Sequence, residues 1–360
     1  MVRQRVVTQI IEDQGSLESF LSTRQNGSGV AIDTEADSLH RYRESLCLIQ
    51  FAHGEDCVVI DPLAIDDLTV LGEFLGTHES WMHGADYDMT MLQREFGMVP
   101  PVVWDTQIGA RLLGIRKFGL ADLVDHYFGV RLSKSSQKAD WGRRPLSAKM
   151  LEYALNDVRY LLPMGEKIIA ALQACGRYDW FVESCQAART RVIERDDARD
   201  EPWRVRGAGK LDRFGLAYLR DLWQWRDGEA KSWDRPTFMV ATNRDLLEWS
   251  SRLAAGNKVE LPRHYRPDRS RRFRTTVEKV GELPKEEWPE RPRGHRRKKN
   301  AAFDQRLDSL LSARDSSAAS LDIESSLIAP RSALEQLAAE EFAPSELLLN
   351  WQIHCLGIEA

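Results

Sequence analysis

Three short acidic clusters, in a fixed order along the first half of the 360-residue chain, constrain its fold more than any other feature. The first (residues 33–35, Asp-Thr-Glu) directly follows the apolar run 30–32, which is typical of a buried strand. The second contains Asp88, and the third contains Tyr153 and Asp157. Carboxylates from three separate elements can converge on a pair of divalent cations, because such ions prefer oxygen ligands.

The first cluster places two carboxylates on one face of a strand. Side chains at i and i+2 of a strand point to the same side, so Asp33 and Glu35 project together. Their like charges raise a pKa at close range unless a cation neutralises them. Taken alone, the pair is more typical of the solvated end of a strand.

The third cluster lies on a predicted helix. Polar and apolar positions of residues 147–171 alternate with helical spacing, which puts Tyr153 and Asp157 one turn apart on one face. A carboxylate and a phenol in this arrangement could bind a metal ion and hold its water. Taken alone, the pair is more typical of a surface aspartate next to a tyrosine.

The second cluster lies at the start of a helix. Residues 80–82 are predicted as a short strand, and residues 89–96 as a helix that stops at Gly97. Asp88 then lies in the first turn, where the helix macrodipole favours an anion. Helix capping is the alternative role, and Asp86 competes with Asp88 for the metal role on the sequence alone.

Taken together, the clusters resemble the three exonuclease motifs of the DEDD superfamily. Tyr153 is typical of its DEDDy branch, because Glu152 stands where a histidine would mark the other branch. The chain is similar to ribonuclease D over residues 1–200, and this similarity favours Asp88 over Asp86 as a ligand. The stretches that carry the resemblance are 31–35, 45–51, 59–63, 83–88, 134–146 and 153–157.

The resemblance implies a set of site residues and cofactors. The metal ligands would be Asp33, Glu35, Asp88 and Asp157, and Tyr153 would position the attacking water. The cofactors would be two divalent cations, Mg²⁺ or Mn²⁺. One would lower the pKa of the water, and the other would stabilise the charge on the leaving 3′-oxygen.

The resemblance also implies an activity. The family acts as a 3′→5′ exoribonuclease on RNA with a free 3′ end, typically a tRNA precursor, and releases nucleoside monophosphates. Two alternatives stay open: an exonuclease of the same branch that acts on DNA or ribosomal RNA, and a non-catalytic RNA-binding protein of the same fold. RNA is distinguished from DNA by contacts with the 2′-hydroxyl, which the sequence does not reveal. No obligate protein partner is expected.

The expected fold class is an α/β exonuclease domain followed by one or two small all-α domains. Residues 1–200 would form a ribonuclease H-like mixed sheet with flanking helices, residues 208–288 resemble an HRDC domain, and residues 295–360 resemble a second, divergent one. The strands are predicted at 29–33, 46–51, 57–60 and 80–83, and the helices of this first domain at 88–96, 105–114, 118–128 and 147–172.

The charge is distributed unevenly along the chain. The net charge of −5 divides into −8 for residues 1–200, +10 for residues 201–300 and −7 for residues 301–360. A basic stretch of this kind is typical of nucleic-acid binding, with a solubilising face as the alternative. The arginines predicted to contact RNA are Arg269, Arg271, Arg272 and Arg274. The run 296–299 adds four more basic residues.

Cysteine usage and hydropathy point to a cytoplasmic location. The five cysteines are odd in number and show no Cys-x-x-Cys spacing, which favours a reducing compartment over a disulfide or zinc framework. No apolar run is long enough to span a bilayer, and the first residues do not resemble a secretory signal. No membrane association is expected.

Overall fold

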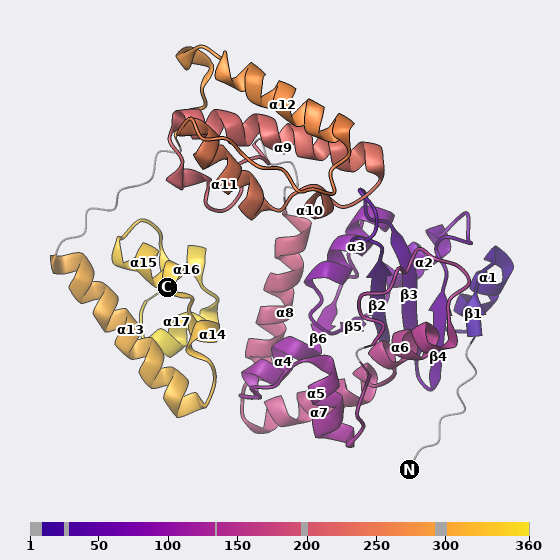
Figure 1. Cartoon of the computed structure of the whole chain (residues 1–360). Helices are drawn as coiled ribbons and strands as arrows, with labels where there is room; N and C mark the ends of the chain where they lie inside the picture. Colours follow the sequence, from indigo (N-terminus) through magenta and orange to yellow (C-terminus); the bar gives the residue numbers. More distant parts are fainter. Residues whose placement is uncertain (1–8, 25–28, 134, 196–200, 292–300, 360) are drawn as a thin grey trace. The chain divides into compact units, whose positions relative to one another are not determined.

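The computed structural model describes residues 9–24, 29–133, 135–195, 201–291 and 301–359. The chain divides into two compact units (Figure 1). One unit comprises residues 1–36, 46–195 and 297–360, and the other comprises residues 37–45 and 196–296. Among the described residues, no helix is both long and apolar enough to cross a membrane.

The larger unit is built on a mixed sheet, as expected from the sequence, and this sheet has six strands. The strands are β1 (Gln9–Ile11), β2 (Val30–Ala36), β3 (Leu46–His53), β4 (Asp56–Ile60), β5 (Ser80–Met82) and β6 (Val103–Asp105), in the order β1-β4-β3-β2-β5-β6. The central strands β2, β3 and β4 are antiparallel, and β1, β5 and β6 are added in parallel. β1 and β6, three residues each, were not predicted.

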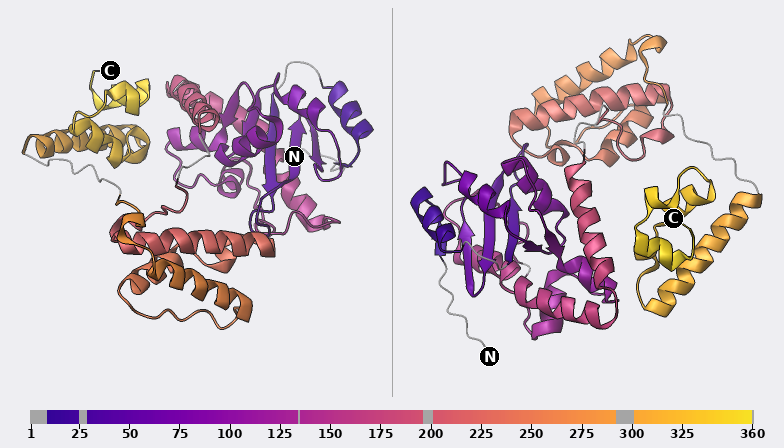
Figure 2. Two further views of the ribbon diagram at one scale, coloured as in Figure 1. Left: turned by 90° about the horizontal axis from the view of Figure 1, so that it is seen from above. Right: turned by 180° about the vertical axis from the view of Figure 1, so that it is seen from behind.

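Helices pack on both faces of this sheet (Figure 2). They are α1 (Gln14–Ser22), α2 (Thr69–Leu75), α3 (Asp86–Phe96), α4 (Thr106–Leu112), α5 (Leu120–Phe128), α6 (Ala148–Arg159), α7 (Leu161–Ala174) and α8 (Tyr178–Ile193). Successive residues of β2 point to opposite faces of the sheet. Ile32 packs with α1, α2 and α3 on one face, whereas Ala31 packs with α4 and α7 on the other. Asp33 and Glu35, further along β2, therefore point to the same face as Ala31.

One predicted helix is two helices. The expectation of a single helix over 147–172 was wrong, because α6 ends at Arg159 and α7 begins at Leu161. Pro163 gives the physical reason: it has no N–H to bond the carbonyl of residue 159, so it fits only in the first turn of a new helix. The break leaves α6 free to present its own face to the sheet.

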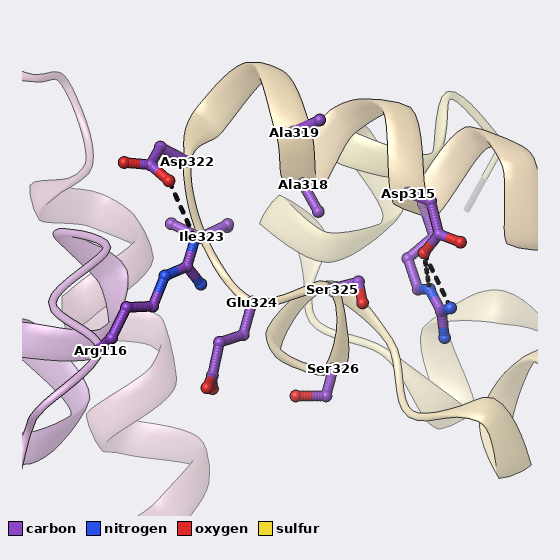
Figure 3. Close-up of a pocket in the computed structure, with 10 residues that line it drawn as sticks. Arg116, Asp315, Ala318, Ala319, Asp322, Ile323, Glu324, Ser325 and Ser326 are labelled. Carbon is purple, nitrogen blue, oxygen red and sulfur yellow. Dashed lines mark hydrogen bonds and ion pairs between the residues drawn. The ribbon is translucent and has the colours of Figure 1, made fainter.

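The C-terminal segment is helical and packs within the larger unit. Its helices are α13 (Ala301–Leu321), α14 (Ser325–Ile328), α15 (Arg331–Ala338), α16 (Pro344–Leu347) and α17 (Asn350–Leu356). The Arg116 guanidinium forms an ion pair with the Asp322 carboxylate, at the turn between α13 and α14, with 2.9 Å between nitrogen and oxygen (Figure 3). Gly114 has φ +81°, and a Cβ there would lie 2.3 Å from the Asp322 carbonyl oxygen. Only glycine therefore permits this close approach.

In the described part of the smaller unit, helices and connecting loops are present and no strand is found. Its elements are α9 (Arg213–Trp233), α10 (Thr237–Val240), α11 (Asn243–Ala254), α12 (Pro267–Gly281) and two short 3₁₀ turns, Ala208–Lys210 and Lys285–Glu287. Trp225, Trp249 and Phe273 form the aromatic centre of its core. The loop 37–45 belongs to this unit, since the Tyr42 hydroxyl donates to the carboxylate of Asp227 at 2.9 Å.

Candidate active site

Two of the predicted clusters meet where β2 ends. Asp33 and Glu35 project from β2 toward α6, whose Ser147 cap starts the helix and whose buried residues face the sheet. Asp157 on α6 meets them there. Carboxylate oxygens of these three residues all lie within 4.8 Å of one another. The structure therefore brings together residues that are more than 120 positions apart in the sequence.

The fourth predicted ligand, Asp88, adjoins this group from α3. Its buried carboxylate oxygen Oδ1 accepts hydrogen bonds from the Thr34 backbone N–H at 2.9 Å and the Thr34 hydroxyl at 2.6 Å. Its rival Asp86 is exposed and pairs with Arg195 at 2.6 Å. The structure thus places Asp88, and not Asp86, beside the other carboxylates.

Burial and crowding raise the pKa values of all four carboxyl groups. Burial, then repulsion from the neighbouring carboxylates, raises the pKa of Asp33 well above its usual range and that of Glu35 to about 9. The same causes raise the pKa of Asp157 to about 7. Burial also raises the pKa of Asp88 to about 7, although the hydrogen bonds from Thr34 oppose the shift. A cluster of like charges with oxygen donors fits divalent cations, which would relieve the repulsion.

Tyr153 lies one turn before Asp157 on α6, half-buried against Trp141 with ring centroids 6.0 Å apart. Burial, and then the charges of Asp157, Glu35 and Asp33, raise the pKa of its phenol well above the ordinary value. The hydroxyl therefore stays protonated at neutral pH and is available as a hydrogen-bond donor.

The chain is similar to proteins of known family. Residues 8–173 match the family model described as 3′-5′ exonuclease. The chain is 32% identical over 295 residues to ribonuclease D of Escherichia coli K12, covering 78% of this chain and 77% of that relative. The chain belongs to the ribonuclease D family.

Other relatives agree with this assignment. Ribonuclease D of Sphingobium indicum is 31% identical over 252 residues, which is 67% of this chain and 63% of that relative, so the alignment spans less than two thirds of its length. The crystal structure of Escherichia coli RNase D, described as an exoribonuclease involved in structured RNA processing, superimposes with a TM-score of 0.74 at 26% identity. That match covers 97% of this chain and 98% of the other, and it confirms the predicted fold class.

The loop 135–146, within a stretch that carries part of the resemblance to ribonuclease D, lies next to Tyr153 through Trp141. Arg144 donates to both carboxylate oxygens of Asp61, at 2.5 and 2.7 Å. It also donates to the backbone carbonyls of Cys47 and Trp141, at 2.8 and 2.7 Å. Arg144 thus ties the loop to β3 and holds the backbone of Trp141, whose indole packs against Tyr153. Sequence reasoning gave Arg144 no role, although both it and Asp61 lie in the stretches that resemble the family.

A second supporting residue is Asp105, which directly precedes α4. It caps α4, because its carboxylate accepts a hydrogen bond from the Gln107 N–H at 2.8 Å. Its carboxylate also accepts from the N–H groups of Gly84 and Ala85, both at 2.9 Å. These two residues form the turn that starts α3, so Asp105 helps to place Asp88. A cap can be predicted from local sequence, but a partner 20 residues away cannot.

The four arginines predicted to contact RNA lie on α12 in the smaller unit. Arg269 and Arg272 both pair with the buried carboxylate of Glu229. Arg271 pairs with Asp268 at 2.7 Å. Arg274 is exposed, and no carboxylate among the described residues pairs with it. The basic run 296–299 lies outside the described residues.

Proposed function

We propose that this protein is a metal-dependent 3′→5′ exoribonuclease. The observation that carries the proposal is the convergence of Asp33, Glu35 and Asp157 within 4.8 Å, with Asp88 adjoining and Tyr153 one helical turn away. Membership of the ribonuclease D family supports the same activity, since the Escherichia coli relative is described as an exoribonuclease.

The cofactors proposed are two divalent cations, Mg²⁺ or Mn²⁺, held by Asp33, Glu35, Asp88 and Asp157. When bound, such ions lower the pKa of a water and stabilise negative charge on a leaving oxygen. Thr34 holds Asp88 in place by its two hydrogen bonds. The protonated hydroxyl of Tyr153 would donate a hydrogen bond that orients the attacking water, and its raised pKa makes it a poor general base.

The substrate proposed is RNA with a free 3′ end, with tRNA precursors as the typical case and nucleoside monophosphates as products. Residues 201–300 carry a net charge of +10, which suits contact with phosphates along the body of the RNA. The HRDC character of residues 208–288 and 295–360, the domain boundaries and the cytoplasmic location stay predictions.

A digestion experiment with matched variants tests the activity. RNA labelled at its 5′ end should shorten stepwise, and RNA labelled at its 3′ end should release mononucleotides at once. A chelator, Asp33→Asn or Asp157→Asn should abolish both. Asp86→Asn is the matched control, because it removes the same charge from an exposed position on α3 and should digest RNA like the parent.

Two outcomes would contradict the proposal. Near-normal turnover by folded Asp33→Asn protein would exclude the carboxylate cluster as the metal site, and rapid cutting of a circular RNA would indicate an endonuclease. Matched RNA and DNA oligonucleotides, digested side by side, test whether the enzyme prefers RNA, since only RNA offers a 2′-hydroxyl.

A further inference from the structure

Gln50 on β3 is a fully buried amide whose polar atoms are unused. Its side chain is 0% exposed, and neither Oε1 nor Nε2 has a hydrogen-bond partner among the described residues. Buried polar groups are nearly always hydrogen-bonded, because an unsatisfied one costs free energy. Apolar residues fill most of β3, so a glutamine at this position calls for a specific reason.

Gln50 lies directly opposite Asp33 in the antiparallel pair of β2 and β3. Residues opposite each other project to the same face, with Cβ atoms about 4.5–5.5 Å apart. Their strand neighbours identify that face: Ala31 and Ala52, each two residues away, pack with α7, whereas Phe51 packs on the other side. The amide and the carboxylate therefore share the layer between the sheet and α6–α7.

The two groups are complementary in their hydrogen bonding. Within the described part of the chain, the Asp33 carboxylate accepts no hydrogen bond, in contrast to Asp88, which accepts two from Thr34. Gln50 offers a donor with no acceptor. Because Gln50 is shielded from solvent, it cannot touch RNA, and any role in the reaction must pass through a neighbouring residue.

We propose that Gln50 is a positioning residue for Asp33. With a divalent cation bound, the Gln50 Nε2 donates a hydrogen bond to the Asp33 carboxylate and holds it in the orientation that ligates the ion. This inference rests on the proposed role of Asp33 as a metal ligand. It adds a residue that carries no charge and lies on a different strand from every carboxylate of the cluster.

Metal affinity, measured without RNA, tests the proposal. Gln50→Met keeps the length of the side chain and removes both polar atoms. Hydrogen-bond partners of metal ligands are typically worth about 10–100-fold in affinity, so Mn²⁺ titrated calorimetrically into the full chain should bind about 10–100-fold more weakly. The metal-free variant should unfold at the same or a higher urea concentration, because an unsatisfied amide has been removed. Parental Mn²⁺ affinity in the folded variant would overturn the proposal.

Ser80→Ala is the matched control. Ser80 on β5 is also 0% exposed with an unpartnered hydroxyl, but its strand partner is Val30 and not a ligand. The Ala variant should bind Mn²⁺ like the parent. An equal loss of affinity in Ser80→Ala and Gln50→Met would assign the effect to disturbance of the sheet and would also overturn the proposal.

A measurement on the unaltered protein covers the case in which Gln50→Met does not fold. The Gln50 side-chain NH₂ signal, followed by NMR after selective labelling, should shift when Mg²⁺ is added to saturation. A signal that stays unchanged would contradict the new hydrogen bond.

Failure of this inference can be told apart from failure of the proposed function. If Asp33→Asn binds Mn²⁺ like the parent, the metal site itself is wrong. If Asp33→Asn loses Mn²⁺ binding while Gln50→Met keeps it, the metal site stands and only the role of Gln50 is rejected.

Discussion

Thr34 donates two hydrogen bonds to one oxygen of Asp88, from its backbone N–H at 2.9 Å and from its hydroxyl at 2.6 Å. The reason lies in the sheet. β5 pairs with β2 only at Val30 and Ala31, so no strand reaches Thr34 on that side. The Asp88 carboxylate from α3 accepts the Thr34 backbone N–H, which a neighbouring strand would otherwise bond. This contact joins the first and second acidic clusters.

Removing the Thr34 hydroxyl should therefore weaken metal binding without disturbing the fold. Thr34→Val keeps the shape and the backbone N–H but deletes one hydrogen bond to a charged group, typically worth about 1.5–3 kcal/mol. The pKa of Asp88 should rise further above about 7, and Mn²⁺ should bind roughly tenfold or more weakly by calorimetry. Thr90→Val is the control, since the hydroxyl partners of Thr90 among the described residues are a backbone carbonyl on the same helix and the Arg195 side chain. Equal losses in both variants would contradict a specific role for Thr34.

The raised pKa values predict an unusual dependence of stability on pH. Without metal, Glu35 titrates at about 9 and Asp157 at about 7, far above their values in the unfolded chain. The folded state then holds more protons than the unfolded state, so the free energy of unfolding should fall as pH rises from about 4 toward 9. Urea unfolding in chelator at pH 5, 7 and 9 measures this. The loss should be smaller in Asp157→Asn, and a variant with the parent's slope would contradict the assignment.

Cation affinity should change in the opposite direction. Divalent ions bind the ionised carboxylates and must displace their protons, so Mg²⁺ affinity should increase between pH 6 and pH 9. Saturating Mg²⁺ should also restore the stability lost at high pH, because it neutralises the repulsion.

Tyr153 should affect turnover and not metal binding. Tyr153→Phe keeps the ring and its contact with Trp141 but removes the hydroxyl. Water-positioning and acid–base groups are typically worth about 10²–10⁴-fold in rate, so single-turnover digestion should slow by this factor while Mn²⁺ affinity stays at the parental value. Turnover at the parental rate would reduce Tyr153 to a packing role. Because the raised pKa keeps the phenol protonated, the rate should show no step from its ionisation below pH 10.

The parts of the site that could be predicted are those set by local spacing. The i, i+2 relation on β2 and the i, i+4 relation on α6 placed Asp33 with Glu35 and Tyr153 with Asp157, because strand and helix periodicity decide these faces. Two strands, β1 and β6, are too short for any periodicity to show.

The supporting contacts could not be predicted, because they join distant positions. Arg144 and Asp61 are 83 residues apart in the chain, and their pairing depends on how the loop 135–146 folds back onto the sheet. Gln50 looks like an ordinary strand residue until the register with β2 is known. Likewise, Glu229 lies 40 residues before Arg269, so the four arginines looked equally available for RNA when two of them pair with Glu229.

This pairing divides the predicted RNA contacts into two classes. Arg272→Gln would remove one of the two arginine partners of the buried Glu229 and leave only Arg269, so the variant should lose stability as well as a positive charge. A loss of RNA binding in that variant would therefore not separate a lost phosphate contact from a loss of stability. Arg271 and Arg274 are exposed, and only Arg271 has a carboxylate partner among the described residues, so these two can test binding itself.

The double variant Arg271→Gln/Arg274→Gln should weaken binding of a 3′-blocked single-stranded RNA and flatten its salt dependence. Each phosphate contact contributes about −0.7 to the slope of log K against log salt on single strands, so the slope should fall by up to about 1.4. Fluorescence anisotropy in an Asp33→Asn background measures binding without cleavage. Arg331→Gln, at an exposed position on α15, is the control and should change neither quantity. If the double variant keeps both the affinity and the slope of the parent, the arginines of α12 serve the structure and solubility of the smaller unit, and the RNA is held elsewhere.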